Sequence, residues 1–167
     1  MKEVKEYLLD AFQGESQANR KYLAFAQKAE AQGLTQIAKI FKAAAEAETI
    51  HALNHLKVMG GIRDTVENLK EAIDGETYEF NQMYPEMIEA AKKSGDKEAL
   101  RTFHFANEVE KVHAELFKKA LKYAESGNDA PQARIHVCPV CGYTVEGEVP
   151  DKCPVCGTKG PSFKEIA

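Results

Sequence analysis

A Glu-x-x-His step occurs twice within helical patterns of this 167-residue chain, and it constrains the fold more than any other feature. The two steps are Glu48-Thr49-Ile50-His51 and Glu110-Lys111-Val112-His113. In an α-helix, residues three apart lie on one face, so the carboxylate and imidazole of each step can bind the same metal ion. The flanking residues match as well, because residues 45–52 align closely with residues 106–114. The sequence therefore indicates a duplicated helical hairpin.

Helix start and stop signals predict four helical segments of roughly 25 to 30 residues, which together describe a four-helix bundle. A glycine follows each of the four segments, and a proline inside the third is expected to bend it. The expected helices are residues 4–32, a second capped by Thr35 and ended by Gly60-Gly61, a third from Thr65 to residue 94 with a bend at Pro85, and a fourth over 97–126 capped by Asp96.

Each hairpin also offers a glutamate from its first helix, because Gly14-Glu15-Ser16 corresponds to Gly75-Glu76-Thr77. Four glutamates and two histidines at one level of a bundle are the ligand set already known from di-iron and di-manganese carboxylate proteins. Carboxylates with imidazoles suit iron or manganese. A solvated helix face is the alternative, and the duplication makes it the weaker one. The six candidate ligands are Glu15, Glu48, His51, Glu76, Glu110 and His113.

The duplication fails at one position, where Ala18 in the first hairpin corresponds to Glu79 in the second. Glu79 is therefore a seventh candidate ligand, and it could replace His51 when the charge of the ion rises. Alternatively, Glu79 holds the proton of a histidine ligand. Tyr22 could donate a hydrogen bond to a ligand carboxylate, and Tyr84 is a weaker candidate for the same role.

The helical period stops after residue 127, and the composition changes. We expect a bundle over residues 1–127, a linker over 128–134 and a small β metal-knuckle domain over 135–167. This last segment holds two Cys-x-x-Cys pairs, which predict a tetrahedral four-sulfur site for zinc or iron, with disulfides as the weaker alternative. Tyr143 and Phe163 are expected to pack beside it. The four expected ligands are Cys138, Cys141, Cys153 and Cys156.

Charge and hydropathy exclude several classes of protein. The formal charge of −4 and the pI near 5.8 disfavour nucleic-acid binding, which usually needs a basic face. No apolar run is long enough for a membrane span, and residues 1–6 lack the apolar core of a signal peptide. We therefore expect a cytoplasmic protein with no membrane partner.

Beyond these features, the chain resembles the rubrerythrin family over essentially its whole length. The resemblance lies in Gly14-Glu15-Ser16-Gln17-Ala18, Gly75-Glu76-Thr77-Tyr78-Glu79, Met83-Tyr84-Pro85-Glu86 and Cys138-Pro139-Val140-Cys141-Gly142-Tyr143. It implies a ferritin-like di-iron bundle followed by a rubredoxin-like Fe(Cys)4 domain. It also implies a peroxidase that reduces hydrogen peroxide to water in oxidative-stress defence. The ligands it implies are the six named above together with Glu79.

The resemblance further implies that electrons reach the di-iron site through the Fe(Cys)4 centre from an external reductase supplied by NAD(P)H. A head-to-tail homodimer would place the cysteine site of one chain near the di-iron site of the other. Two other functions stay open on the residues alone. One is iron oxidation and handling, as in ferritins, and the other is a structural zinc-ribbon binding module.

The connection between the second and third helices raises a topological problem. These helices must run parallel if the hairpins form a ferritin-like bundle, yet only about residues 60–64 connect them. Five to eight residues span under roughly 27 Å, against about 38 Å for the helix. We therefore expect a domain-swapped dimer, unless the third helix begins late, near Asp74.

Overall fold

The computed structural model describes residues 3–167 and divides the chain into two compact units, one ending at Arg63 and the other beginning at Asp64. Met1 and Lys2, where the expectation about a signal peptide begins, lie outside the described residues. The expected division into a bundle, a linker and a cysteine-containing domain stays a prediction, because the boundary between the two compact units lies elsewhere, inside the helical part of the chain. Each unit is described below by itself.

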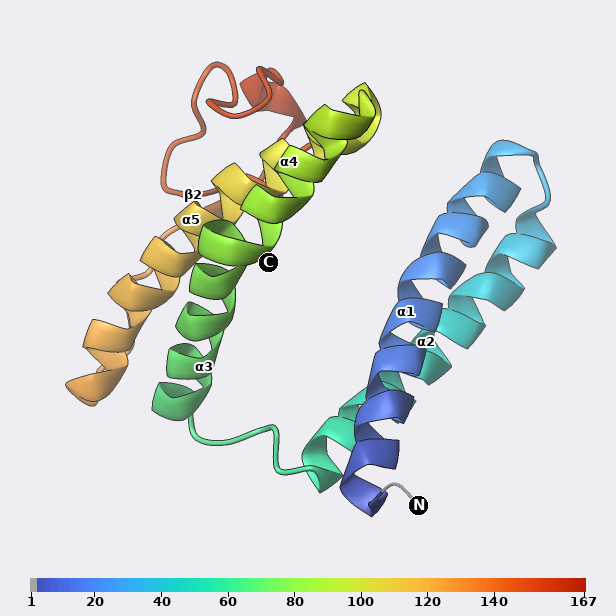
Figure 1. Cartoon of the computed structure of the whole chain (residues 1–167), viewed down its shortest axis with the longest axis horizontal. Coiled ribbons are helices and arrows are strands. Elements are labelled where there is room, and N and C mark those ends of the chain that lie inside the picture. The colour runs from blue at the N-terminus through green and yellow to red at the C-terminus, as the bar shows by residue number, and fades with distance from the viewer. Residues whose placement is uncertain (1–2) are drawn as a thin grey trace. The chain divides into compact units, whose positions relative to one another are not determined.

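The first unit is a helical hairpin of α1 (Val4–Ala31) and α2 (Thr35–Val58), shown in blue to cyan in Figure 1. Alanines form its seam, with Ala26, Ala38 and Ala45 each 1% exposed. Small side chains let the two helices approach closely. Asn19 ties them together, because its Nδ2 donates to the Ala45 carbonyl oxygen at 2.7 Å and to Thr49 Oγ1 at 2.8 Å.

In the second unit, one long helical segment lies against α5 (Lys97–Glu125), as Figure 1 shows. This segment consists of α3 (Thr65–Tyr78), a π-helical stretch η1 (Glu79–Met83) and α4 (Tyr84–Ser94). The sequence predicted a bend at Pro85, and the structure places the irregularity just before that proline. Proline has no N–H for the helix ladder and crowds the preceding turn, which a wider π turn accommodates.

The helix starts confirm one of the two predicted caps and correct the other. Asp96 Oδ1 accepts from the N–H groups of Glu98 and Ala99 at 3.1 and 2.9 Å, as expected. The third helix begins at Thr65, as expected, and Asp64 caps it by accepting from Glu67 N at 3.0 Å. Thr35 is likewise the first residue of α2 and does not cap it. Because α3 begins at Thr65, the alternative of a late start near Asp74 is wrong.

The C-terminal residues 135–167, called here the cysteine domain, form a small antiparallel sheet with strand order β2-β1-β3. The strands are β1 (Ile135–Val137), β2 (Thr144–Glu146) and β3 (Lys164–Ile166). Tyr143 and Phe163 pack edge to face with ring centroids 6.4 Å apart, as expected. Strand β2 lies against α5 (Figure 1), so the cysteine domain belongs to the same compact unit as that helix.

Within residues 3–167, four long helical segments and one three-stranded sheet confirm the predicted fold class. None of the described helices is both long and apolar enough to cross a membrane.

Candidate metal centres

The first hairpin by itself gathers three of the predicted ligands. Glu15 on α1 and Glu48 and His51 on α2 bring one ligand atom each to within 4.8 Å of one another. Glu48 Oε2 lies 2.8 Å from His51 Nδ1, as the i,i+3 spacing predicts. The His51 side chain is 55% exposed, whereas that of Glu48 is 18% exposed. This set is called the first half-site.

The second unit repeats this arrangement with Glu76 on α3 and with Glu110 and His113 on α5. Glu110 Oε2 lies 2.8 Å from His113 Nδ1, and Glu76 Oε1 lies 3.7 Å from the same nitrogen. The ligand atoms again fall within 4.8 Å of one another. This second half-site is more enclosed than the first, because the His113 side chain is only 29% exposed.

Burial and mutual repulsion make the carboxylates of the second half-site hold a proton when no metal is bound. Burial, the hydrogen bond with Glu110 and the negative charge of Glu110 together raise the pKa of Glu76 to about 7, while the charge of His113 lowers it. Burial also raises the pKa of Glu110. Two half-buried carboxylates this close need either a shared proton or a cation. The donor set therefore fits a metal ion of the iron or manganese class.

Glu79 lies beside this half-site without joining its close cluster. Burial and the negative charge of Glu76 raise the pKa of Glu79, while His113 lowers it. Its carboxylate is thus within electrostatic reach of two members of the half-site. The structure leaves both suggested roles open, a ligand that replaces His51 and a partner that holds a histidine proton.

Tyr84, the weaker of the two tyrosine candidates, also lies near the second half-site. Burial raises the pKa of Tyr84, and so do the charges of Glu110, Glu79 and Glu76. In the π turn the N–H of Tyr84 donates to the carbonyl of Glu79, five residues earlier. In an α-helix the acceptor would be four residues earlier. Regular helical spacing therefore underestimates this tyrosine, because a π turn, which lacks a simple sequence signal, shifts the helical register and brings it near the site.

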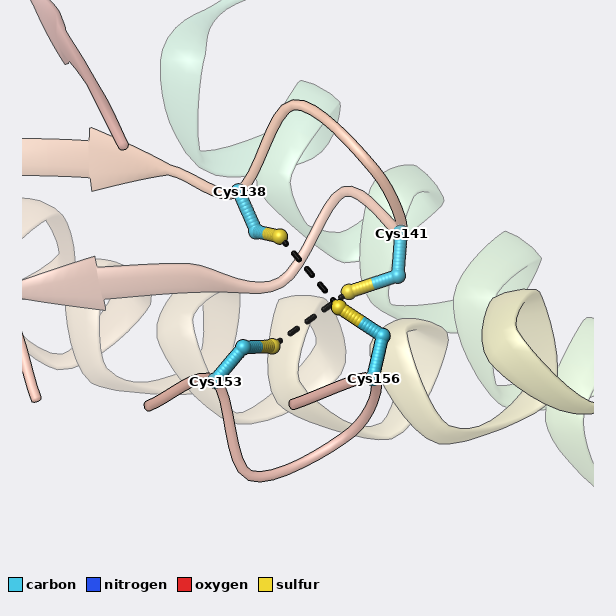
Figure 2. A group of neighbouring side chains, drawn as sticks. All are labelled: Cys138, Cys141, Cys153 and Cys156. Atoms are coloured by element: carbon cyan, nitrogen blue, oxygen red, sulfur yellow. Dashed lines mark hydrogen bonds between the residues drawn. The ribbon is translucent and has the colours of Figure 1, made fainter. Parts of the chain in front are cut away.

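The four cysteines of the cysteine domain converge on one point, as Figure 2 shows. Their sulfurs lie 3.6 Å apart for Cys138 and Cys156 and 3.5 Å apart for Cys141 and Cys153. A tetrahedral ion with metal–sulfur bonds of about 2.3 Å needs sulfurs about 3.8 Å apart. All four are free thiols. The spacing fits a metal site, which disfavours the disulfide alternative.

The thiols of the cysteine domain differ in pKa. Burial raises the pKa of Cys141 and of Cys153. Burial opposes ionisation of Cys156 as well, yet hydrogen bonds from the side chain and backbone of Thr158 lower its pKa to about 6. Without a metal, Cys156 therefore ionises before Cys141 and Cys153.

Comparisons with known proteins agree with this geometry. The family model described as rubrerythrin matches residues 6–121, and the model described as the rubrerythrin rubredoxin-like domain matches residues 136–164. This chain belongs to the rubrerythrin family. Among its curated relatives, rubrerythrin-2 of Clostridium acetobutylicum is 39% identical, and the match covers 95% of this chain and 94% of that protein.

Two nigerythrin comparisons extend this result to structure. Nigerythrin of Nitratidesulfovibrio vulgaris is 38% identical over 90% of this chain and 80% of that protein. The solved structure of the partially reduced state of nigerythrin is similar with a TM-score of 0.59 and 32% identity, covering 99% of this chain and 88% of that one. Within the rubrerythrin family, the Glu/His half-sites and the four cysteines are the groups of a di-iron site and a rubredoxin-like iron site.

The structure thus gathers ten of the eleven predicted metal ligands into three clusters and leaves Glu79 at the edge of one. It also reveals a contact that the sequence analysis missed, between His113 and Thr144 of the cysteine domain. No local pattern predicts this contact, because the two residues are 31 positions apart and belong to differently folded segments.

Proposed function

We propose that this rubrerythrin-family chain is a peroxidase that reduces hydrogen peroxide to water at a di-iron site formed by the two half-sites. The observation that supports this best is the joint presence of a carboxylate-histidine donor set and a four-cysteine site in one chain. An iron pair, when bound, would supply the two electrons that break the O–O bond. Two protons complete the reaction, in which one peroxide and two electrons yield two waters.

One side chain of the protein holds a proton near the reacting atoms. Burial and the charges of Glu110, Glu79 and Glu76 raise the pKa of Tyr84, so its hydroxyl stays protonated beside these carboxylates. A neutral tyrosine can donate a hydrogen bond to an oxygen that gains negative charge. Tyr84 is therefore our candidate for orienting a peroxide oxygen.

The cysteine domain distinguishes this proposal from iron storage, because storage of iron needs no electron-transfer centre. We expect the four-cysteine site to hold iron and to receive electrons from an external reductase in a reducing compartment such as the cytoplasm. The reduced, iron-loaded chain should be oxidised rapidly by peroxide, with two electrons lost per peroxide. Deposition of iron from ferrous salts without peroxide turnover would instead indicate ferroxidase activity, and a colourless zinc-loaded protein would indicate a structural module.

We also infer that the chain works as a domain-swapped homodimer. Only Met59 to Asp64 connect α2 to α3, and such a connection reaches at most about 24 Å, whereas α2 is about 36 Å long. A ferritin-like arrangement of parallel α2 and α3 within one chain needs a longer crossover. Two chains that exchange hairpins avoid this crossover and still pair a first half-site with a second one.

The surface of the first unit supports the same inference. By itself, this hairpin exposes several large apolar side chains, among them Ile40 at 62%, Ile50 at 54% and Leu53 at 52%. Single exposed apolar residues are ordinary, but a helical face carrying many of them is a surface for another segment. The occupant that we propose is the second unit of another copy of this chain, because it carries the complementary half-site.

A further inference from the structure

Thr144, the first residue of β2, is the residue of the cysteine domain that contacts the second half-site of the same chain. Its Oγ1 donates to the Gly142 carbonyl oxygen at 3.1 Å and lies 3.2 Å from His113 Nε2. Gly142 directly follows Cys141, one of the four cysteines. A single hydroxyl group therefore joins a cysteine turn to a histidine of the Glu/His site.

The direction of these two hydrogen bonds follows from the groups involved. A threonine hydroxyl has one proton, and the carbonyl of Gly142 can only accept. Oγ1 thus gives its proton to that carbonyl and accepts the N–H of His113 Nε2. The imidazole then presents the lone pair of its other nitrogen, Nδ1, on the side of Glu110 at 2.8 Å and Glu76 at 3.7 Å, where it could bind a metal ion.

The first half-site has no such hydroxyl. His51 meets Glu48 through Nδ1, as His113 meets Glu110, but its side chain is 55% exposed. Within residues 3–167, no hydroxyl group is hydrogen-bonded to its Nε2. The two Glu-x-x-His steps therefore have the same contact at histidine Nδ1 but differ at Nε2. Within the described residues, only the Nε2 of the second hairpin contacts the cysteine domain.

Contacts on both sides of Thr144 hold the cysteine domain in place on α5. Lys119 Nζ on α5 pairs with the Glu146 carboxylate at the other end of β2. Gly142 lies so near α5 that a Cβ atom added to it would be 3.7 Å from Val109 Cγ1. The Thr144–His113 hydrogen bond thus belongs to a packed surface between β2, the cysteine turn and α5.

We propose that Thr144 is a positioning residue that fixes His113 with Nδ1 directed to the metal and couples this imidazole to the Cys141–Gly142 turn of the same chain. This inference rests on the proposed role of His113 as a ligand. It also changes the expectation of a head-to-tail pairing, because the cysteine domain already lies against a half-site of its own chain. In a swapped dimer, the other chain then supplies only the first half-site.

The test uses the full-length chain with zinc in the cysteine site and further zinc titrated into the bundle. Thr144→Val removes the hydroxyl at nearly constant volume, and Thr144→Ser keeps it. Imidazole ¹⁵N NMR should show an Nε2-protonated His113 in the parent and in Thr144→Ser. In Thr144→Val, exchange of that proton with water should accelerate at least tenfold, and zinc affinity at the His113 half-site should fall by about tenfold.

Thr102→Val is the matched control, because Thr102 is an exposed hydroxyl residue of α5 that lines a hollow beside the cysteine domain with Val140 and Cys156. This variant and the His51 signal in every protein should match the parent. Unchanged proton exchange and zinc affinity in Thr144→Val, with zinc bound at His113, would overturn the inference and leave the proposed function standing. If zinc in the parent never perturbs His113, both the inference and the ligand set of the proposed function are wrong.

Discussion

His113 Nδ1 lies 2.8 Å from Glu110 Oε2, and the pair formed by His51 and Glu48 repeats this distance in the other hairpin. The two hairpins share this geometry, but the environments of their histidines differ. Thr144 meets the second histidine, whereas the first histidine is largely exposed in its unit. Within the described residues only His113 has its Nε2 held by a threonine hydroxyl, and this asymmetry supports the hypothesis that Glu79 replaces His51, and not His113, when the charge of the ion rises.

Removal of one ligand carboxylate should impair the Glu/His site and leave the cysteine site unchanged. We expect Glu48→Gln to lower peroxide-dependent oxidation of the iron-loaded protein by about 100-fold or more, because loss of even an outer-shell partner of a metal ligand costs 10–100-fold. The absorption of the cysteine site should not change. Stopped-flow spectroscopy on the reduced protein measures both quantities.

Glu46→Gln is the matched control for that variant. Glu46 lies two residues earlier on α2, is exposed and points away from the ligand face. It should behave like the parent protein. Equal losses of activity in the two variants would show that a general change in charge, and not the loss of a ligand, explains the effect.

The raised pKa of Glu76 predicts how the stability of the metal-free protein depends on pH. The folded-state pKa is about 7 against an ordinary value of 4.5, so the folded state binds the proton more tightly than the unfolded state. The resulting stabilisation is fully present below about pH 4.5 and is lost as the pH rises through about 7. Between these values, the melting temperature of the parent should fall relative to that of Glu76→Gln.

Thermal melts of the metal-free proteins across this pH range check the prediction. Glu115→Gln is a suitable control, because Glu115 lies on the exposed side of α5 with its side chain 74% exposed. Its melting profile should run parallel to that of the parent. A Glu76→Gln profile that also runs parallel to the parent would mean that this carboxyl group keeps an ordinary pKa.

Much of this architecture could be predicted from the sequence because its signals are local. The Glu-x-x-His steps, the Asp96 cap and the Cys-x-x-Cys turns depend on spacing within one turn of helix or loop, and the structure confirms each of these local geometries. A prediction that failed was also local, since Thr35 is the first residue of α2 and does not cap it. A capping side chain must stand just before the first helical residue, and spacing alone does not fix that boundary to one residue.

The remaining features depend on relations that spacing does not encode. Tyr84 reaches the second half-site because a π turn shifts the helical register before Pro85. Thr144 reaches His113 only after the cysteine domain has packed against α5. Both contacts follow from tertiary packing, which overrides the periodicity from which helical faces are predicted.

The acidity of Cys156 predicts the order in which the metal-free thiols react. With a pKa of about 6, this thiol is roughly 90% ionised at pH 7, whereas burial keeps Cys141 and Cys153 protonated. Alkylation by iodoacetamide followed by peptide mass spectrometry should therefore label Cys156 before Cys141 and Cys153. Thr158→Val should slow this labelling several-fold, because the valine cannot donate a hydrogen bond to the thiolate.

Metal-loaded protein provides the control for that experiment, since ligation should protect all four cysteines. The prediction is wrong if Cys141 is labelled before Cys156 in the metal-free chain. It is also wrong if Thr158→Val reacts at the rate of the parent.

Complementation between two inactive variants tests the domain swap directly. Glu48→Ala damages the first half-site of a chain, and Glu110→Ala damages the second half-site. In a swapped heterodimer of these variants, one composite site carries both substitutions and the other carries neither. Co-expression with random pairing should therefore restore about a quarter of the parent's active sites, whereas each variant alone stays inactive.

An unswapped dimer gives the opposite result, because every site then comes from a single chain that carries one of the two substitutions. A second measurement separates the swap from poor pairing of the variants. Insertion of about ten flexible residues between Gly60 and Asp64 lengthens the connection beyond the roughly 36 Å of α2, so one chain can pair its own hairpins. Light scattering should then show a monomer with activity, and co-expression of the two substitutions in this lengthened chain should no longer restore any site.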